Sequence, residues 1–238
     1  MNKIATTADI ADTVKIGNNV EIGENAVIHD YVVIKDNVKI GCCAEIFSFA
    51  VIGRLPKSAG ITARKLGSDF KPVSIGSGSV ISPGVVIYAD VQIGDNCLIG
   101  DHASIREGAV IADRCLISRN VTLNYNVTVG EGTKILDNTH ITGNCTIGAN
   151  VFTSAGVVTV NDNNIGRAGY TDGGITGPVI GDYVSVGASA VLMPAVQIGD
   201  NSIVAAGSVV KKNVKPYSVV AGNPAKFVTK VPDYLING

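Results

Sequence analysis

An aliphatic residue recurs at every sixth position over most of the chain. The first run extends from Ile16 to Ile52, the second from Ile75 to Ile147 and the third from Ile180 to Val210. Such a period matches neither an α-helix, which repeats every 3.6 residues, nor a simple alternating strand. It suits a triangular coil in which each hexapeptide supplies one short strand and one corner, and three hexapeptides complete a turn.

The residues around each aliphatic position support this interpretation. A small residue such as Val, Ala or Cys often lies two positions earlier, and Gly often follows directly, as in Ile93-Gly94 and Ile198-Gly199. The aliphatic side chain therefore points inward and the small residue fills the space beside it. Coils of this kind stack through parallel ladders about 4.8 Å apart. The sequence predicts an all-β parallel β-helix of about nine coils.

Two polar, Gly-rich segments and a tail interrupt the period. Residues 53–72 separate the first and second runs, and residues 160–178 separate the second and third. We expect both segments to project from the prism as loops. The predicted β-helix covers residues 1–213, and residues 214–238 form a C-terminal cap with a short helix as one option.

Composition and charge exclude several classes of protein. The net charge is −1 and no Lys/Arg run interleaves with aromatic residues, which argues against binding nucleic acid. No apolar stretch is long enough to span a membrane, and the N-terminus lacks the apolar core of a signal peptide. Cys97, Cys115 and Cys145 fall at small core positions, so we expect buried reduced thiols and a cytoplasmic location.

Two stretches resemble the hexapeptide-repeat acyltransferase family, and the resemblance extends over nearly the whole chain. The first, VSVGASAVLMPAVQIGDNSIVAAGSVVKKNVKPYSVVAGNPAK at residues 184–226, is similar to the C-terminal acyl-CoA-binding signature of these enzymes. The second, IGDHASIREG at residues 99–108, followed by THITGNCTIGANVF and VNDN, resembles N-acyltransferases of nucleotide-linked amino sugars. The resemblance implies a left-handed β-helix and a homotrimer with active sites between neighbouring subunits.

The resemblance also implies acetyl-CoA or another short acyl-CoA as cosubstrate, lying along the groove between two prisms. Carried over, the pantetheine arm would meet backbone amides around Gly187 and Ala205, and Lys211 and Lys212 would meet the phosphates of CoA. A solvated corner is the alternative interpretation of the two lysines. Asn223 belongs to the same signature, although a plain turn explains it equally well.

Acyl transfer to an amine requires a group that takes the proton of the amine, and family members commonly supply a histidine. His102 is one candidate, because we expect it to lie outward beside Asp101 and near Arg106 and Glu107, which could orient and charge the ring. His140 is the other and should also face outward. Some enzymes of this kind work without a protein base, and Asp101 and Glu107 would then hold the amine. Arg106 is also a candidate for contacting the substrate.

The acceptor would be held by residues of the second loop and of the coil surface. Asn161 and Asp162 are candidates for contacting the sugar, Arg167 for the diphosphate, and Tyr170 for stacking on the base. Solvated loop positions are the alternative interpretation of these four residues. Two further candidates on the coil surface are Asn124 and Asn126.

Three other functions fit the same fold. A zinc carbonic anhydrase needs three converging histidines, but His29, His102 and His140 occupy different positions relative to the repeat, so no metal is expected. A non-catalytic β-helix scaffold would require neither the C-terminal signature nor the long Gly-rich loop. A sugar O-acetyltransferase remains the alternative enzyme, and the sequence favours a short-chain acyltransferase acting on a nucleotide-linked deoxy amino sugar for surface polysaccharide.

Overall fold

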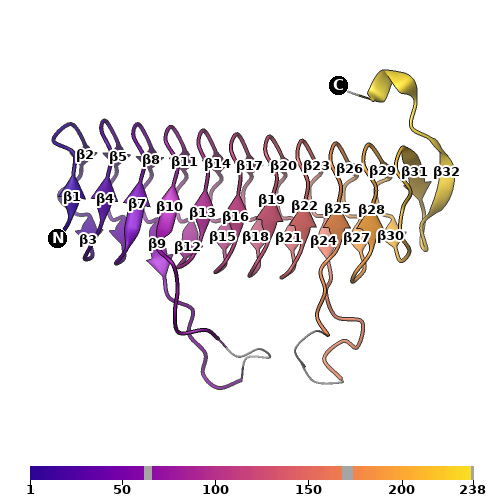
Figure 1. Ribbon diagram of the computed structural model, residues 1–238, viewed down its shortest axis with the longest axis horizontal. Helices are drawn as coiled ribbons and strands as arrows, with labels where there is room; N and C mark the ends of the chain where they lie inside the picture. Colours follow the sequence, from indigo (N-terminus) through magenta and orange to yellow (C-terminus); the bar gives the residue numbers. More distant parts are fainter. Residues whose placement is uncertain (62–65, 168–173, 237–238) are drawn as a thin grey trace.

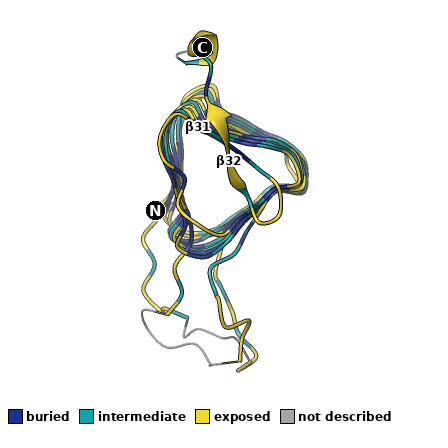
Figure 2. Cartoon of the chain, turned by 90° about the vertical axis from the view of Figure 1, so that its right-hand side faces the viewer, coloured by how far each residue is buried: buried dark blue, intermediate teal, exposed yellow. Residues whose placement is uncertain are grey.

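The chain winds into a left-handed parallel β-helix with a triangular cross-section, as expected from the sequence. The computed structural model describes residues 1–61, 66–167 and 174–236. Figure 1 shows the coils stacked along one long axis, and Figure 2 looks along that axis at the triangle. Each coil supplies one strand to each of three sheets, which we call sheets A, B and C.

The strands are short and parallel, and the same face of the prism returns at every third strand. Sheet A contains β1 (Lys3–Ile4), β4 (Glu21–Ile22), β7 (Val38–Ile40), β10 (Val73–Ile75), β13 (Gln92–Ile93), β16 (Val110–Ile111), β19 (Thr128–Val129), β22 (Thr146–Ile147), β25 (Val179–Ile180) and β28 (Gln197–Ile198). Sheet B contains β2 (Asp9–Ile10), β5 (Val27–Ile28), β8 (Glu45–Ile46), β11 (Val80–Ile81), β14 (Leu98–Ile99), β17 (Leu116–Ile117), β20 (Lys134–Ile135), β23 (Phe152–Thr153), β26 (Ser185–Val186), β29 (Ile203–Val204), β31 (Ser218–Ala221) and β32 (Lys226–Lys230). Sheet C contains β3 (Lys15–Ile16), β6 (Val33–Ile34), β9 (Val51–Arg54), β12 (Val86–Tyr88), β15 (Ser104–Ile105), β18 (Thr122–Leu123), β21 (His140–Ile141), β24 (Val158–Thr159), β27 (Val191–Leu192) and β30 (Val209–Val210).

The expected number of about nine coils was too low. The strands β1–β30 place ten strands in each of sheets A and C, and therefore form ten complete coils. The additional strands end at Ile4, Ile10 and Thr159. The first two precede the aliphatic run that begins at Ile16, and the third carries a hydroxyl where the repeat normally has an aliphatic side chain. At about 4.8 Å per coil the prism is about 48 Å long.

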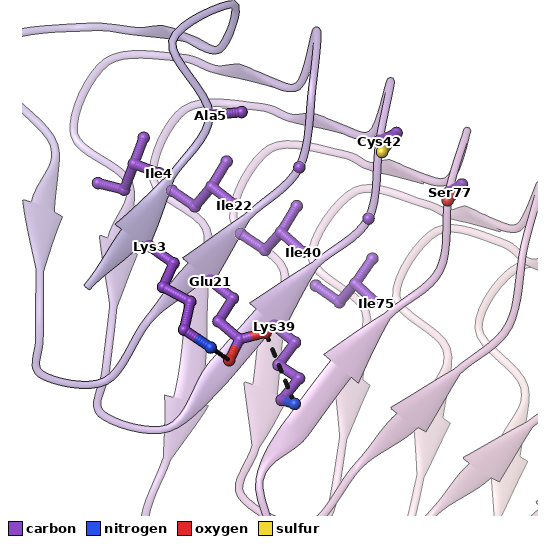
Figure 3. A pocket seen from close by; sticks show the side chains of 12 residues that line it. Lys3, Ile4, Ala5, Glu21, Ile22, Lys39, Ile40, Cys42, Ile75 and Ser77 are labelled. Atoms are coloured by element: carbon purple, nitrogen blue, oxygen red, sulfur yellow. Dashed lines mark hydrogen bonds and ion pairs between the residues drawn. The ribbon is translucent and has the colours of Figure 1, made fainter. Parts of the chain in front are cut away.

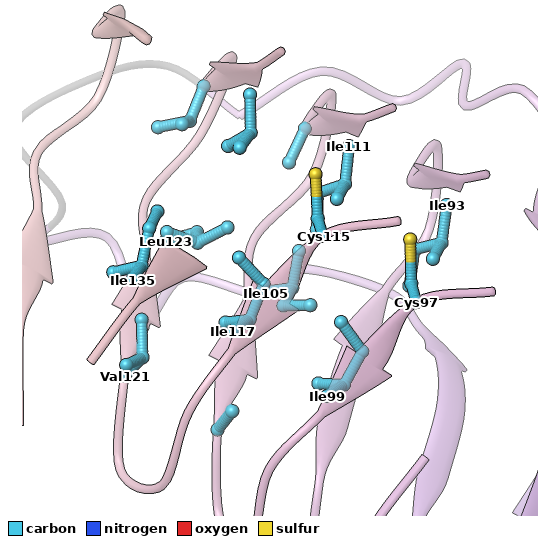
Figure 4. Packing of buried hydrophobic residues seen from close by; sticks show 14 of the residues in the cluster. Ile93, Cys97, Ile99, Ile105, Ile111, Cys115, Ile117, Val121, Leu123 and Ile135 are labelled. Carbon is cyan, nitrogen blue, oxygen red and sulfur yellow. The ribbon is translucent and has the colours of Figure 1, made fainter. Parts of the chain in front are cut away.

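The core is a single column of the inward-facing aliphatic side chains. Ile105 and Ile117 have no exposed surface, and Cys97 and Cys115 lie beside Ile93 and Ile111 of their own coils (Figure 4). Burial of each such aliphatic side chain stabilises the fold by about 2 kcal/mol before the entropy of the chain is counted. Thr153, which like Thr159 replaces an aliphatic residue of the repeat, is still buried, and its hydroxyl has no hydrogen-bond partner among the described residues.

The corners of the triangle explain the many asparagines. The third residue after each inward aliphatic often adopts a positive φ, as at Asn19 (55°), Asn96 (54°) and Asn150 (54°). Asn tolerates this left-handed conformation better than other residues with a Cβ atom, because its side chain hydrogen-bonds locally. The same position in other coils carries His102 (58°) and Tyr31 (62°), so a side chain at this corner points outward whatever its type.

Both long loops leave the prism from the same corner. Each follows a strand of sheet C, β9 or β24, and leads into a strand of sheet A, β10 or β25. Their described parts project on the same side (Figures 1 and 2). β9 belongs to the third coil and β24 to the eighth, so the two loops flank the fourth to seventh coils at this C–A corner.

The predicted cap, residues 214–238, is described up to residue 236. It contains β31, which extends sheet B by one parallel strand, and β32, which returns antiparallel to β31. A 3-10 helix at Asp233–Leu235 follows. The antiparallel strand covers the end of sheet B, where an open edge would otherwise expose unpaired backbone groups.

Candidate functional site

The outward face of sheet C changes from apolar to polar side chains between the two loops. In strict register, the outward residues from the first coil to the tenth are Lys15, Val33, Val51, Val86, Ser104, Thr122, His140, Val158, Val191 and Val209. Between the second coil and the tenth, three polar side chains therefore interrupt a ladder of valines. This polar segment occupies the fifth to seventh coils and ends at His140.

His140 lies at the C-terminal end of the polar segment and is half-buried. Its Nδ1 lies 2.6 Å from Oγ1 of Thr122, the residue directly opposite on the preceding coil. Burial lowers the pKa of His140 below its usual 6.5, because the imidazolium is solvated less well here than in water. The ring is therefore neutral at pH 7. If Nδ1 donates its proton to Thr122, the lone pair of Nε2 is left to act as a base.

His102 lies at a different place, on the corner where sheet B turns into sheet C. It is exposed, and its ring lies directly over Gly84 of the preceding coil. Asp101 lies beside it and contributes to raising the pKa of Arg119 on the next coil, after the larger contribution of Asp137. Arg119 pairs with Asp137, so a column of alternating charges runs along this corner.

The expectation that His102 lies near Arg106 and Glu107 was wrong. Strand β15 separates them, so His102 is at the B–C corner and the other two residues are at the C–A corner. Arg106 Nε and Nη2 donate to the two carboxylate oxygens of Glu107 at 2.8 and 3.0 Å. Glu107 is only 5% exposed. The buried carboxylate of Glu107 therefore holds the guanidinium of Arg106 in a bidentate pair.

The two candidate asparagines of the coil surface differ in backbone conformation and in hydrogen-bond partner. Asn126 is a corner residue with φ 54°, and its Nδ2 donates to Asn144 Oδ1 at 3.1 Å on the next coil. Asn124 lies on the C–A corner, where its side-chain oxygen accepts the backbone N–H of Tyr125 at 2.9 Å. The ring of Tyr125 packs against Gly143, where a Cβ would meet the ring at 2.5 Å. Tyr125 therefore lies against Gly143, three residues after His140 on the next coil, and Asn124 lies beside Tyr125 at the same corner.

The second loop begins close to this segment. Asn161 donates its Nδ2 to the carbonyl oxygen of Gly143 at 3.1 Å, which ties the loop to the coil of His140. Asp162 accepts the backbone N–H groups of Asn164 and Gly166, each at 2.7 Å, so its carboxylate organises the turn. Arg167 is exposed. Tyr170 lies outside the described residues.

The residues assigned to the cosubstrate lie in the ninth and tenth coils and beyond. The N–H groups of Gly187 and Ala205 already donate to the carbonyls of Val204 and Val220, at 2.7 and 2.9 Å. A pantetheine arm near these two residues must therefore use other backbone groups. The remaining residues of this set, which are all exposed, are Lys211, Lys212 and Asn223.

The sequence analysis did not predict a cavity of about 890 Å³ at the C-terminal end. Four lysines line it together with apolar residues such as Val214, Val220 and Phe227, and these lysines are Lys212, Lys215, Lys226 and Lys230. The only signal for it in the sequence is the recurrence of lysine through the tail. The fold brings these lysines together because β32 runs back along β31.

A second cavity, of about 580 Å³, lies over sheet A at the N-terminal end (Figure 3). Lys3 and Lys39 flank Glu21 there, and the hydrogen bond from Lys3 is the largest cause of the lowered pKa of that carboxyl. The cavity opens on a different face of the prism from His140. It therefore does not belong to the polar segment of sheet C.

The sequence analysis missed Thr122, Tyr125 and Tyr88 as members of this region. Thr122 could have been found, because it stands eighteen residues, or one full coil, before His140. Among the residues that the structure describes, no three His, Cys, Asp or Glu side chains group so as to hold a metal ion. Within the same described part, no helix is long and apolar enough to cross a lipid bilayer.

Comparison with known proteins agrees with this fold. The family model described as bacterial transferase hexapeptide (six repeats) matches residues 13–48, 72–106, 90–125, 126–161 and 177–212, more than half of the chain. A solved UDP-N-acetylglucosamine acyltransferase of Arabidopsis is similar in fold, with a TM-score of 0.61 and 18% identity, covering 96% of this chain and 74% of that one.

Two curated relatives match over shorter segments. A protein of Lysinibacillus sphaericus named as a probable macrolide acetyltransferase is 54% identical over 52 residues, which are 22% of this chain and 29% of the relative. A chloramphenicol acetyltransferase of Agrobacterium fabrum is 42% identical over 62 residues, 26% of this chain and 29% of the relative. The chain thus spans less than a third of the length of these relatives.

Proposed function

The chain belongs to the bacterial transferase hexapeptide family, and on this premise we propose that it transfers a short acyl group from CoA to the amine of a nucleotide-linked deoxy amino sugar. The observation that carries the proposal is His140, a half-buried imidazole within hydrogen-bond distance of Thr122 in the polar segment of sheet C, whose pKa is lowered by burial. That two relatives carry the word acetyltransferase in their names supports acetyl as the acyl group.

In the proposed reaction the neutral amine of the sugar attacks the thioester carbonyl of the acyl-CoA. A C–N bond forms and the C–S bond breaks, which gives an amide and the thiolate of CoA. Nε2 of His140 takes the proton that the amine loses and passes it to the departing sulfur. The low pKa of His140 suits this role, because the ring is unprotonated at neutral pH and returns the proton readily.

The positions along the prism support separate binding regions for the acceptor and for the acyl-CoA. The acceptor would lie at the C–A corner between the two loops, near Asn124, Tyr125 and Asn161. The acyl-CoA would approach from the ninth and tenth coils, where the C-terminal signature lies. Three coils, about 14 Å, separate the tenth coil from that of His140. A homotrimer would complete each site with the surface of a neighbouring subunit.

A thiol-release assay tests the proposal. Acetyl-CoA is offered with a panel of dTDP- and UDP-linked amino sugars, the same sugars with a hydroxyl in place of the amine, simple glycosides and chloramphenicol. We expect thiol release and an N-acetyl product with a nucleotide-linked amino sugar. Release only with the hydroxyl compounds would favour sugar O-acetylation, and no release with any nucleotide-linked sugar would reject the acceptor class.

Two variants test the choice of base. His140→Gln should lower kcat by about 10²- to 10⁴-fold, the usual contribution of a general base. His102→Gln is the matched control, since it removes an exposed histidine at the opposite corner and should leave kcat within about threefold. Full activity of His140→Gln, or a large loss in His102→Gln, would reject His140 as the base.

A further inference from the structure

Two arginines face one tyrosine ring at the C–A corner, between the two loops. The guanidinium carbon of Arg54 lies 5.0 Å from the centroid of the Tyr88 ring, and that of Arg106 lies 4.8 Å from it. Tyr88 pairs with Arg54 in the ladder of sheet C, and Arg106 follows β15 on the next coil. Three consecutive coils therefore contribute to one cationic cluster.

The charges of this cluster do not cancel. Arg106 is held by Glu107 through two of its five N–H donors, and its other donors have no partner among the described residues. Arg54 is exposed and pairs with no carboxylate in the described part of the chain. The face of Tyr88 stabilises both guanidinium groups, because the π-face of an aromatic ring attracts cations. The cluster thus keeps one net positive charge and several oriented N–H donors.

We propose that Arg54 and Arg106 bind the diphosphate of a nucleoside diphosphate, which is the nucleotide part of the acceptor. This assignment rests on the proposed function. Guanidinium groups are suited to phosphate because they donate two parallel hydrogen bonds to its oxygens. The buried Glu107 and the ring of Tyr88 hold the two guanidinium groups in place before the ligand arrives, which lowers the entropy cost of binding.

The distance to His140 fits the same ligand. Arg106 lies two residues after Ser104, which is in register with Thr122 and then with His140, so two coils, or about 10 Å along the axis of the prism, separate Arg106 from the level of the base. A sugar linked to the diphosphate would then extend toward His140. CoA also contains a diphosphate, but its signature residues lie beyond His140 in the ninth and tenth coils. The cluster therefore lies on the acceptor side.

Equilibrium binding measurements distinguish the two sources of diphosphate. The probes are dTDP, UDP and CoA, and the variants are Arg54→Gln and Arg106→Lys, the latter of which keeps the charge beside Glu107 but loses the planar fork. Arg114→Gln is the matched control for Arg54→Gln, because Arg114 is also exposed to solvent yet pairs with Glu131 on another corner. Thermal unfolding of each variant verifies that the fold is intact.

We expect Arg54→Gln and Arg106→Lys to weaken binding of dTDP or UDP by about tenfold or more, the loss of a charge-assisted hydrogen bond, with CoA binding unchanged. Arg114→Gln should bind all three probes as the parent does. Unchanged dTDP and UDP binding in both cluster variants would reject the site. A loss confined to CoA would also reject it, because the cluster would then serve the donor.

The kinetic assay separates this inference from the proposed function. With a nucleotide-linked acceptor, Arg54→Gln should raise KM for the acceptor while kcat and KM for acetyl-CoA stay unchanged. If no amine acceptor turns over and the arginines still determine dTDP or UDP binding, the proposed function fails and the site stands. If amine transfer proceeds with equal KM in the parent and in Arg54→Gln, the site fails and the function stands.

Discussion

The contact between Thr122 and His140 offers the most direct test of the candidate site. Replacement of Thr122 by Val keeps the shape of the side chain but removes the hydroxyl that lies 2.6 Å from Nδ1. The ring then loses the group that favours the Nδ1–H tautomer, whose Nε2 is the base. A hydrogen bond of this kind contributes about 0.5–1.5 kcal/mol, so kcat should fall by about three- to tenfold. Thr122→Ser, which keeps the hydroxyl, should restore most of it.

The pH dependence of kcat shows whether the hydroxyl acts through the histidine. Burial lowers the pKa of His140, so in the parent the base is lost only when the pH falls below the usual value of 6.5. In Thr122→Val the imidazolium has one polar neighbour fewer and its pKa falls further. The acid limb should therefore move to lower pH while the plateau drops. A merely structural role for Thr122 would lower the stability without moving the limb.

The assay is steady-state thiol release between about pH 5 and pH 8 with saturating acetyl-CoA and acceptor, because kcat then reports groups in the bound complex. His140→Gln provides the background rate without the base. A plateau and an acid limb in Thr122→Val identical to those of the parent would show that the hydroxyl does not position His140. An equal loss in Thr122→Ser and Thr122→Val would show the same, because the serine retains the donor and acceptor.

Three further predictions concern the coil itself. Ile117→Ala removes a fully buried side chain from the middle of the column and should lower the free energy of unfolding by about 3–4 kcal/mol. Ile4→Ala, at the N-terminal end where Ile4 is 42% exposed, should lower it by about half as much or less. Both values are measured by urea unfolding at fixed protein concentration. Equal losses at the two positions would contradict the packing argument. In the native protein, a thiol reagent should modify the exposed Cys42 and Cys43 quickly and leave the three buried cysteines unmodified until unfolding; fast modification of all five would refute this. Gly41→Ala should destabilise the coil measurably in thermal unfolding, because the added Cβ would lie 2.6 Å from a backbone nitrogen of the next coil, and an unchanged Tm would show that the coil can shift to admit it.

The buried cysteines illustrate how far position in the repeat predicts chemistry. Cys145 occupies a small-residue position two places before an inward aliphatic, and burial raises the pKa of its thiol to about 12. Cys97 and Cys115 take the same position in neighbouring coils and lie one above the other (Figure 4). The interaction between the two thiols raises the pKa of Cys115 and lowers that of Cys97 to about 7, while burial disfavours the thiolate at both sites. The burial of all three thiols follows from the period, whereas the coupling of Cys97 with Cys115 depends on the stacking of two coils.

The candidate site was harder to predict from the sequence. The outward direction of His140 follows from the buried Ile141 beside it, and the structure places the side chain on that face. The partner of His140 does not follow from the neighbouring residues, because it comes from another coil. His102 and Glu107 stand close together in the sequence yet lie at opposite edges of sheet C. Residues that flank a strand lie at two different corners of the prism, and their short separation in the sequence does not reveal this.

The hexapeptide period by itself determined the coil and the inward aliphatic column, because the direction of each side chain depends on its position within a few neighbouring residues. The left hand of the coil was implied by the family resemblance and not by the period. The tertiary structure alone decided which residues of different coils meet. Each loop adds residues between stacked strands, so that Tyr88 pairs with Arg54 and Val158 pairs with Val191 rather than with the residue eighteen positions away. The length of an irregular loop does not specify where the chain rejoins the prism. Packing of the next coil onto the exposed strand edge does so, and it brings Arg54 next to Tyr88.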